Sequence, residues 1–358
     1  MRYALIGCGR IAVNHLEAAV KNGYEVVALC DIKPEAPSAL LTRCGIDGKS
    51  IRQYTDYQEM LKKEKPEVVA VATESGNHAQ IAETVLEQGI PLLIEKPMAL
   101  SLKDADRMIT IGEEKHVPFA VCQQNRYNLT SQLVRKAIDK GYFGKISHIA
   151  LTVRWSRNAD YYRQGDWRGT WEEDGGALMN QCIHGCDLLR WFGGNDIDTV
   201  SGTLCNRFHP YLPVEDIGLA TVRFKNGIIG TIEGTTNAWK DDFEETITIF
   251  GEKGMVRLNG KVAEQIGTWE FEEKEAMELR DTIHDQNFTS VYGNGHASVY
   301  ADMKEAIAEK RPPYVDCHDG RRSLELVLAI YKSHKEGRPV SLPLSDFSTM
   351  EMKGVKLL

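Results

Sequence analysis

The feature that most constrains the fold is a glycine-rich turn, GCGRIA, at residues 7–12. It is flanked by three expected elements: the strand YALIG (3–7), the helix NHLEAAVKNG (14–23) and the strand EVVALCD (25–31). This is the context in which a dinucleotide fingerprint occurs. Gly7 permits the tight turn, Gly9 lets the backbone approach a pyrophosphate, and Ala12 takes the third position, where a small residue allows close packing.

An acidic residue follows the turn at the spacing that a dinucleotide site needs. Asp31 ends the second strand, 24 positions after Gly7. There it can accept hydrogen bonds from both ribose hydroxyls and would repel a 2'-phosphate, which favours NAD over NADP. Lys33 lies close enough to weaken that preference. The alternative is an ordinary doubly wound domain that binds no nucleotide.

Strands and helices continue to alternate up to about residue 122, which predicts a Rossmann-type, doubly wound parallel sheet. Ligands of such sheets bind at the carboxyl ends of the strands. Polar residues stand at several of these ends: Thr73, Glu95, Lys96 and Gln124. Pro97 restricts the backbone of Lys96, so the lysine is held within a narrow range of directions. A surface Glu-Lys turn is the alternative interpretation.

After residue 122 the pattern changes to strands joined by hairpins. KISHIALTVRW (145–155) is the first long strand, and Asn226-Gly227 predicts a hairpin farther on. Two helices, at about 296–310 and at 321–337, end the chain. We therefore expect an NAD-binding domain at 1–122 and, at 123–358, an α+β domain with a large, mostly antiparallel sheet that binds substrate and forms the oligomer interface.

Residues 174–194 are expected to form one helix that carries Asn180, His184 and Asp187 on a single stripe. A histidine on such an apolar helix is more often a core residue than a catalyst. Cys182, His184 and Cys186 would point in different directions, so we expect no metal there. Upstream, RWSRNADYYRQGDWRGTW (154–171) concentrates arginines and aromatic residues, which suit an anionic ligand with flat rings.

Charge and composition limit the classes of partner. Lysine and arginine number 43 against 51 aspartates and glutamates, a net charge of −8, which argues against nucleic acid and anionic membranes. The eight cysteines are scattered, and we see neither a signal peptide nor a membrane span. These observations predict a cytoplasmic protein.

With GCGRIA, Asp31, the Glu-Lys-Pro motif and the His184 helix in this order, the chain resembles the Gfo/Idh/MocA oxidoreductase family. The segments EKPMA, QNRYN, DWRGTWEEDGGALMNQ, ITIFGEKGMVRL, VYGNGH and GRRSLELVLAIYKS are similar to those of the WlbA-like UDP-2-acetamido-2-deoxyglucuronate 3-dehydrogenases. The resemblance implies that Lys96 hydrogen-bonds the reacting hydroxyl and that His184 takes its proton. Many relatives have an aspartate where this chain has Asn180, and the resemblance implies that the asparagine positions the sugar.

The residues expected at the site fall into two groups. The NAD-binding group is Gly7, Gly9, Arg10, Ile11, Asp31, Thr73, His78, Glu95, Lys96, Gln124, Trp167 and Arg168. The substrate-binding group is Lys96, Arg126, Arg157, Tyr161, Asn180 and His184.

The resulting expectation is an NAD-dependent dehydrogenase that oxidises C3 of a UDP-linked N-acetylated hexuronate in lipopolysaccharide sugar synthesis. The resemblance implies a homodimer or homotetramer. An inositol or free-sugar dehydrogenase of the same family is the first alternative, and a catalytically silent NAD-binding sensor is the second. The chemistry agrees with the residues, because histidine can accept a proton near neutral pH and an ammonium favours a developing alkoxide.

Overall fold

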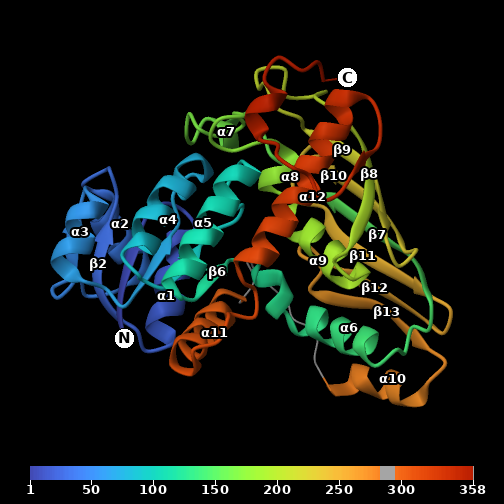
Figure 1. Cartoon of the computed structure of the whole chain (residues 1–358), viewed down its shortest axis with the longest axis horizontal. Helices are drawn as coiled ribbons and strands as arrows, with labels where there is room; N and C mark the ends of the chain where they lie inside the picture. The colour runs from blue at the N-terminus through green and yellow to red at the C-terminus, as the bar shows by residue number, and fades with distance from the viewer. Residues whose placement is uncertain (283–294, 358) are drawn as a thin grey trace. The chain divides into compact units, whose positions relative to one another are not determined.

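The computed structural model describes residues 1–282 and 295–357 (Figure 1). These residues form two compact units: residues 1–124 with 295–321, and residues 125–282 with 322–357. The division near residue 124 lies close to the boundary expected from the sequence, but a later segment returns to the first unit. Within the described residues, the helices lack the length and apolar character needed to cross a membrane.

The first unit contains a sheet of six parallel strands in the order β3-β2-β1-β4-β5-β6. The strands are β1 (Arg2–Ile6), β2 (Glu25–Cys30), β3 (Arg52–Tyr54), β4 (Val68–Val71), β5 (Leu92–Ile94) and β6 (Phe119–Val121). The helices are α1 (Ala12–Lys21), α2 (Ala36–Cys44), α3 (Tyr57–Glu64), α4 (His78–Glu87), α5 (Leu102–Lys115) and α11 (Gly295–Glu309). The doubly wound Rossmann sheet is therefore confirmed.

The central strands of this sheet are buried along their whole length, as expected when helices cover both faces. Helices α4 and α5 pack against one another, and α1 packs against α11, which lies far away in the sequence (Figure 1). Side chains start two of the helices: Asp56 caps α3, and Ser101 caps α5 by accepting a hydrogen bond from the Asp104 N–H.

The second unit contains a sheet of eight strands in the order β13-β12-β11-β7-β10-β9-β8-β14. The pairing is antiparallel except between β7 and β10, so the mostly antiparallel sheet is confirmed. The strands are β7 (Ile146–Arg154), β8 (Ile197–Cys205), β9 (Ile217–Phe224), β10 (Ile229–Thr235), β11 (Glu244–Gly251), β12 (Gly254–Asn259), β13 (Gln265–Phe271) and β14 (Val340–Ser341).

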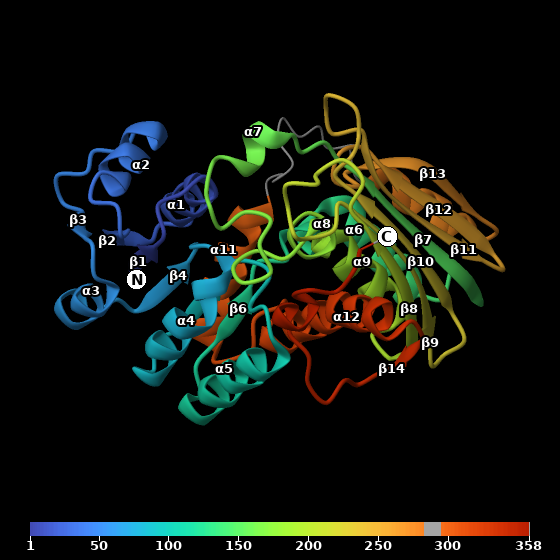
Figure 2. The same cartoon turned by 90° about the horizontal axis from the view of Figure 1, so that it is seen from above.

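Helices cover one face of this sheet. Along β9 the residues alternate between buried and exposed, as expected for a strand with one covered and one open face. Helices α8, α9 and α12 lie on the covered face (Figure 2). The helices are α6 (Leu129–Asp139), α7 (Ala159–Tyr162), α8 (Ala177–Asn180), α9 (Ile183–Gly193), α10 (Lys274–Leu279) and α12 (Cys317–Glu336). The expected hairpin at Asn226-Gly227 joins β9 to β10.

The single helix expected over residues 174–194 is wrong: the segment forms two helices, α8 and α9, with a break between them. The Ala177 carbonyl accepts hydrogen bonds from the N–H groups of both Gln181 and Cys182, each at 3.0 Å. The second bond spans one residue more than an α-helical bond, so the regular spacing is lost. Asn180 lies on α8, whereas His184 and Asp187 lie on α9. The three residues are therefore not on one continuous helix, as the expected stripe required.

Candidate active site

The glycine turn leaves room for a dinucleotide. Gly7 has φ of +94°, and a Cβ atom there would lie 2.5 Å from the Ala72 carbonyl oxygen at the end of β4. A Cβ atom on Gly9 would meet nothing within 4 Å among the described residues. Gly7 is thus required by packing inside the sheet, whereas Gly9 keeps the outer side of the turn open. Arg10 and Ile11 follow directly and lead into α1. The turn fits a pyrophosphate at the helix N-terminus.

Asp31 is fixed beside this turn. Its Oδ2 accepts a hydrogen bond from the Cys8 N–H at 2.8 Å, and its Oδ1 accepts one from the Lys33 N–H at 2.9 Å. Each carboxylate oxygen has a further lone pair that can accept a ribose hydroxyl. The Arg43 guanidinium donates to the carbonyls of Cys8 and Gly9 at 2.9 and 3.1 Å, so it lies against the same turn. The sequence analysis did not find Arg43.

The ends of β4 and β5 are tied together by a buried histidine. The ring nitrogens of His78 lie 2.8 Å from the Pro97 carbonyl and 3.1 Å from the Thr73 carbonyl. Burial lowers the pKa of His78, which favours the neutral ring, and a neutral ring can donate to only one of the two carbonyls. His78 is only 1% exposed, so it holds the backbone of Thr73 and of the Lys96-Pro97 turn from the buried side. Its direct contact with NAD stays a prediction.

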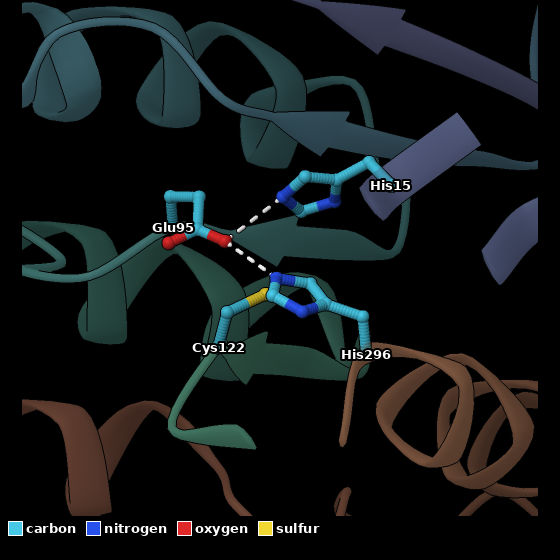
Figure 3. A group of neighbouring side chains, drawn as sticks. All are labelled: His15, Glu95, Cys122 and His296. Carbon is cyan, nitrogen blue, oxygen red and sulfur yellow. Dashed lines mark hydrogen bonds and ion pairs between the residues drawn. The ribbon is translucent and has the colours of Figure 1, made fainter. Parts of the chain in front are cut away.

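Glu95, at the end of β5, is a buried carboxylate in contact with two imidazoles (Figure 3). Its Oε1 lies 3.0 Å from Nε2 of His15 in α1 and 3.0 Å from Nε2 of His296 in α11. Its Oε2 accepts the backbone N–H of Lys96 at 3.1 Å. Burial alone would raise the pKa of Glu95, but the hydrogen bonds from the two histidines outweigh it and hold the pKa well below its usual range. The carboxylate is therefore ionised.

In the second unit, His184 is the second residue of α9 and is 5% exposed. The preceding helix α8 is held by Glu215, which accepts the Leu178 N–H at 3.0 Å and the Tyr331 hydroxyl at 2.9 Å. Burial raises the pKa of Glu215 to about 8. A Cβ atom on Gly176 would lie 1.7 Å from the Glu215 carboxylate, so only glycine fits there.

Asn180, at the end of α8, donates a side-chain hydrogen bond to the buried Asp174. Asp174 also accepts the backbone N–H of Gly169 at 2.6 Å and so joins α8 to the loop that carries Trp167 and Arg168. The sequence analysis did not identify Asp174. Its spacing of six residues from Asn180 gave no signal.

Arg126 belongs to a buried ion cluster. Its guanidinium donates two hydrogen bonds to Asp187, at 2.6 and 2.7 Å, and Arg190 donates a third at 2.8 Å. Burial alone would raise the pKa of Asp187, but the two guanidiniums lower it to about 2. Arg126 is 2% exposed. The expected contact between Arg126 and a substrate stays a prediction, whereas its structural contact with Asp187 is plain.

The loop after β7 gathers arginines and aromatic rings. The Arg157 guanidinium lies 2.6 Å from Asp242 and packs over the rings of Trp155 and Tyr161. Arg168 donates to the Tyr161 hydroxyl at 2.7 Å and stacks on the ring of Trp167, with 4.3 Å to its centroid. The structure therefore brings together Arg157, Tyr161, Trp167 and Arg168, as the sequence suggested. It also adds Asp242, which the sequence analysis missed.

The predicted residues divide between the two units. The first unit contains Gly7, Gly9, Arg10, Ile11, Asp31, Thr73, His78, Glu95, Lys96 and Gln124, and the second contains Arg126, Arg157, Tyr161, Trp167, Arg168, Asn180 and His184. The sequence analysis missed His15 and His296. The only signal for His15 was its place on the apolar face of α1, beside Ala12, Leu16 and Ala19.

Two family models match the chain. A model described as the oxidoreductase family, NAD-binding Rossmann fold, matches residues 1–123, and one described as the GFO/IDH/MocA C-terminal domain matches residues 131–257. The glycine turn, with its open outer side and the fixed Asp31, agrees with the first description.

Solved structures and curated relatives point in the same direction. The WlbA dehydrogenase from Bordetella pertussis, solved in complex with NADH and UDP-GlcNAcA, is 36% identical, with 96% of this chain and 98% of that chain covered and a TM-score of 0.87. The WlbA enzyme from Chromobacterium violaceum, solved with the same ligands, is 35% identical, with 96% of each chain covered and a TM-score of 0.86. The myo-inositol 2-dehydrogenase of Thermotoga maritima is 23% identical over 96% of this chain and 98% of its own length.

Family models match parts of both units, and two solved structures above 30% identity extend over nearly the whole chain. The chain belongs to the Gfo/Idh/MocA family and is an NAD-dependent oxidoreductase that acts on the CH–OH groups of sugars or polyols.

Proposed function

We propose that this enzyme oxidises the C3 hydroxyl of a UDP-linked N-acetylated hexuronate. The observation that carries the proposal is the 36% identity, over nearly the full length of both chains, to a WlbA dehydrogenase solved with NADH and UDP-GlcNAcA. The residue at position 180 supports it, since asparagine there resembles the UDP-sugar branch of the family. We further propose a cytoplasmic homodimer or homotetramer, which light scattering of the purified protein would distinguish.

In the proposed reaction, Lys96 and His184 act on the reacting hydroxyl. NAD, when bound, accepts the hydride at its nicotinamide ring. The Lys96 ammonium hydrogen-bonds the hydroxyl oxygen and stabilises the negative charge that develops on it. The His184 imidazole takes the hydroxyl proton, a step that a histidine can perform near neutral pH. Asn180, with its amide fixed by Asp174, positions the sugar and transfers no proton.

The acidic part of the substrate is assigned to Arg157. A guanidinium can hold a carboxylate through two parallel hydrogen bonds, which lysine cannot reproduce. One edge of Arg157 is already engaged by Asp242, at 2.6 Å from Nη1. The proposal therefore requires the substrate to use the other edge, Nε and Nη2, or to displace Asp242.

A panel of sugars tests the proposed substrate. NADH formation is measured with UDP-N-acetylglucosaminuronate, UDP-N-acetylglucosamine, myo-inositol and glucose, by single-turnover as well as steady-state assay so that a retained cofactor is detected. The proposal expects the uronate to give the highest kcat/KM. Lys96→Ala and His184→Ala should each lower kcat on the order of 100- to 10,000-fold. Near-normal turnover in either variant would refute that residue's chemical role, and thermal melts check whether His184→Ala only unfolds the protein.

Arg157 variants test the uronate assignment separately. Arg157→Ala should reduce kcat/KM for the uronate strongly and for the UDP-hexose much less, because the hexose has a hydroxymethyl group in place of the carboxylate. Truncating one partner of a buried charge pair costs on the order of 2–5 kcal/mol. Arg157→Lys should recover only part of the loss. Equal losses for both sugars would mean that Arg157 contacts the diphosphate or shapes the loop.

Cofactor choice tests Asp31. NAD should bind more tightly than NADP, because the Asp31 carboxylate would repel a 2'-phosphate. Asp31→Ala should narrow the difference, since Arg43 and Lys33 then remain beside the ribose position. Equal binding of the two cofactors by the unaltered enzyme would contradict this role of Asp31.

A second candidate is an inositol or free-sugar dehydrogenase. It is favoured by curated relatives such as the inositol dehydrogenase of Thermotoga maritima and the 1,5-anhydro-D-fructose reductase of Ensifer adhaerens, the latter 26% identical. Turnover of myo-inositol above that of every UDP-sugar would establish it. A silent NAD-binding sensor would turn over none of these compounds, but the chain keeps both Lys96 and His184, for which a sensor has no chemical need.

A further inference from the structure

A continuous chain of buried hydrogen bonds runs through the first unit to Glu95. The hydroxyl oxygens of Tyr3 and Tyr300 lie 2.7 Å apart, and the Tyr300 hydroxyl lies 2.7 Å from Nδ1 of His15. His15 then contacts Glu95 through Nε2, and His296 contacts the same carboxylate oxygen from the other side (Figure 3). All of these residues are at most 5% exposed. Protons in such a place must each have an acceptor.

Only one assignment of protons satisfies the chain around Glu95. Two imidazole Nε2 atoms face one carboxylate oxygen, and a protonated carboxyl group could donate to only one of them. With Glu95 ionised, both Nε2–H groups donate to it, Nδ1 of His15 accepts from Tyr300, and the Tyr300 oxygen accepts from Tyr3. Burial also lowers the pKa of His15, in agreement with a neutral ring. The cluster therefore holds one buried negative charge.

The same side chains resemble a metal site, but hydrogen bonding accounts for them better. His15, Glu95, Cys122 and His296 bring four potential ligand atoms within 4.8 Å of one another. A tetrahedral zinc site would place its nitrogen and oxygen ligand atoms about 3.3 Å apart and would need lone pairs, not protons, on both Nε2 atoms. The two 3.0 Å contacts to Glu95 are already ordinary hydrogen-bond distances. Buried cysteine commonly serves as a small apolar residue.

We infer that His15 and His296 are positioning residues that hold the Glu95 carboxylate as a fixed anion, which in turn anchors the backbone of Lys96. The inference rests on the proposed function only in that Lys96 acts on the reacting hydroxyl. Glu95 Oε2 accepts the Lys96 N–H at 3.1 Å, so rotation of the carboxylate moves the turn that carries the lysine. Small displacements of a group at the reacting centre can lower the rate on the order of 100-fold.

The first test needs no substrate. Protonation of Glu95 is followed by infrared titration of the cofactor-free protein, with Glu95→Gln to identify the band of its carboxyl group. His15→Leu and His296→Leu each remove one donor, so Glu95 should take up its proton at higher pH than in the unaltered protein. His15→Gln and His296→Gln place an amide N–H near the Nε2 position and should restore most of the difference. An unchanged titration in both leucine variants would overturn the inference.

Tyr24→Phe is the matched control. The buried Tyr24 hydroxyl donates to the Tyr300 backbone carbonyl at 2.9 Å and stands outside the proton chain. This variant should leave the Glu95 titration unchanged; a shift equal to that of the leucine variants would attribute the effect to general loosening of the cluster. If a leucine variant fails to fold, the glutamine variant at that position decides: a titration close to that of the unaltered protein supports the donor role. A stoichiometric metal in the purified protein would overturn it.

The second test measures turnover with NAD and UDP-N-acetylglucosaminuronate as a function of pH. The leucine variants should lower kcat on the order of 10- to 100-fold, most strongly at the acid end of the profile, while the Kd of NAD changes little. The glutamine variants should recover most of the activity. A loss that is equal at every pH and equal in leucine and glutamine variants would indicate a structural role alone. Near-normal turnover of Lys96→Ala would refute the proposed role of Lys96 and leave the infrared result standing.

Discussion

Glu95 and Asp187 are both buried carboxylates, yet the donors that hold them differ in charge. Glu95 in the first unit accepts hydrogen bonds from two imidazoles, which carry no fixed positive charge. Asp187 in the second unit contacts the guanidiniums of Arg126 and Arg190, which leaves one net positive charge. A buried carboxylate can thus be held by imidazole donors or by guanidiniums, but only between the guanidiniums is the acid needed to offset two fixed like charges.

The largest effect should come from neutralising the acid between the two arginines. Asp187→Asn leaves two buried guanidiniums without a counter-charge, and the loss of unfolding free energy should be about 3–5 kcal/mol. Urea unfolding followed by tryptophan fluorescence measures it. A cost below about 1 kcal/mol would show that Arg126 and Arg190 find other partners and that the cluster is not held by charge.

Neutralising Glu95 should cost less, because the imidazoles that remain, unlike guanidiniums, carry no fixed positive charge. In Glu95→Gln the amide oxygen can still accept from the imidazoles, while the amide N–H₂ group faces the Lys96 N–H and one donor loses its acceptor. We expect a loss of about 1–3 kcal/mol. Unfolding of this variant under the conditions used for Asp187→Asn provides the comparison, and equal losses would remove the distinction between neutral and charged donors.

The pH dependence of stability should separate the two clusters. Burial lowers the pKa of His15, whose ring faces Glu95, His296 and Tyr300, so the unfolded chain takes up a proton near its ordinary pKa of 6.5 before the folded protein does. Stability should therefore fall as the pH drops below about 6.5, by at most about 1.4 kcal/mol per pH unit for each such histidine. His78 contributes in the same direction.

Asp187 should contribute nothing to the pH dependence of stability between about pH 5.5 and 7.5. Its pKa of about 2 lies below the ordinary value of 3.8, so its contribution is complete above about pH 5 and is lost only in stronger acid. Chemical unfolding at pH 7.5, 6.5 and 5.5 measures the slope, with His15→Gln as the variant that should flatten it. A slope that is the same in His15→Gln and in the unaltered protein would contradict the assignment to His15.

The smallest effect should come from an exposed pair. Asp160 and Arg163 lie 2.9 Å apart in and beside α7, with side chains that are 82% and 70% exposed. Asp160→Asn should change the unfolding free energy by no more than about 0.5 kcal/mol. This variant sets the baseline, since a substantial loss here would mean that the larger values at Asp187 and Glu95 do not report on burial.

Local signals made part of this molecule predictable. The turn containing Gly7 and Gly9, the spacing to Asp31 and the polar strand ends depend on short segments, and the structure places them as expected. The contacts of Glu95 depend on His15 and His296, which are 80 and 201 positions away. No local pattern reports such a contact. The break between α8 and α9 escaped for a different reason, since a single carbonyl that accepts two N–H groups leaves the apolar pattern of the segment unchanged.

The return of α11 to the first unit has a consequence for synthesis of the chain. As the protein leaves the ribosome, all six strands of the first sheet are complete by residue 121, but His296 follows only after every strand from β7 to β13. Until then Glu95 lacks one of its two imidazole donors, and α1 lacks the helix that packs beside it. The nucleotide-binding unit therefore begins to fold first and is completed late, after most of the second unit has been made.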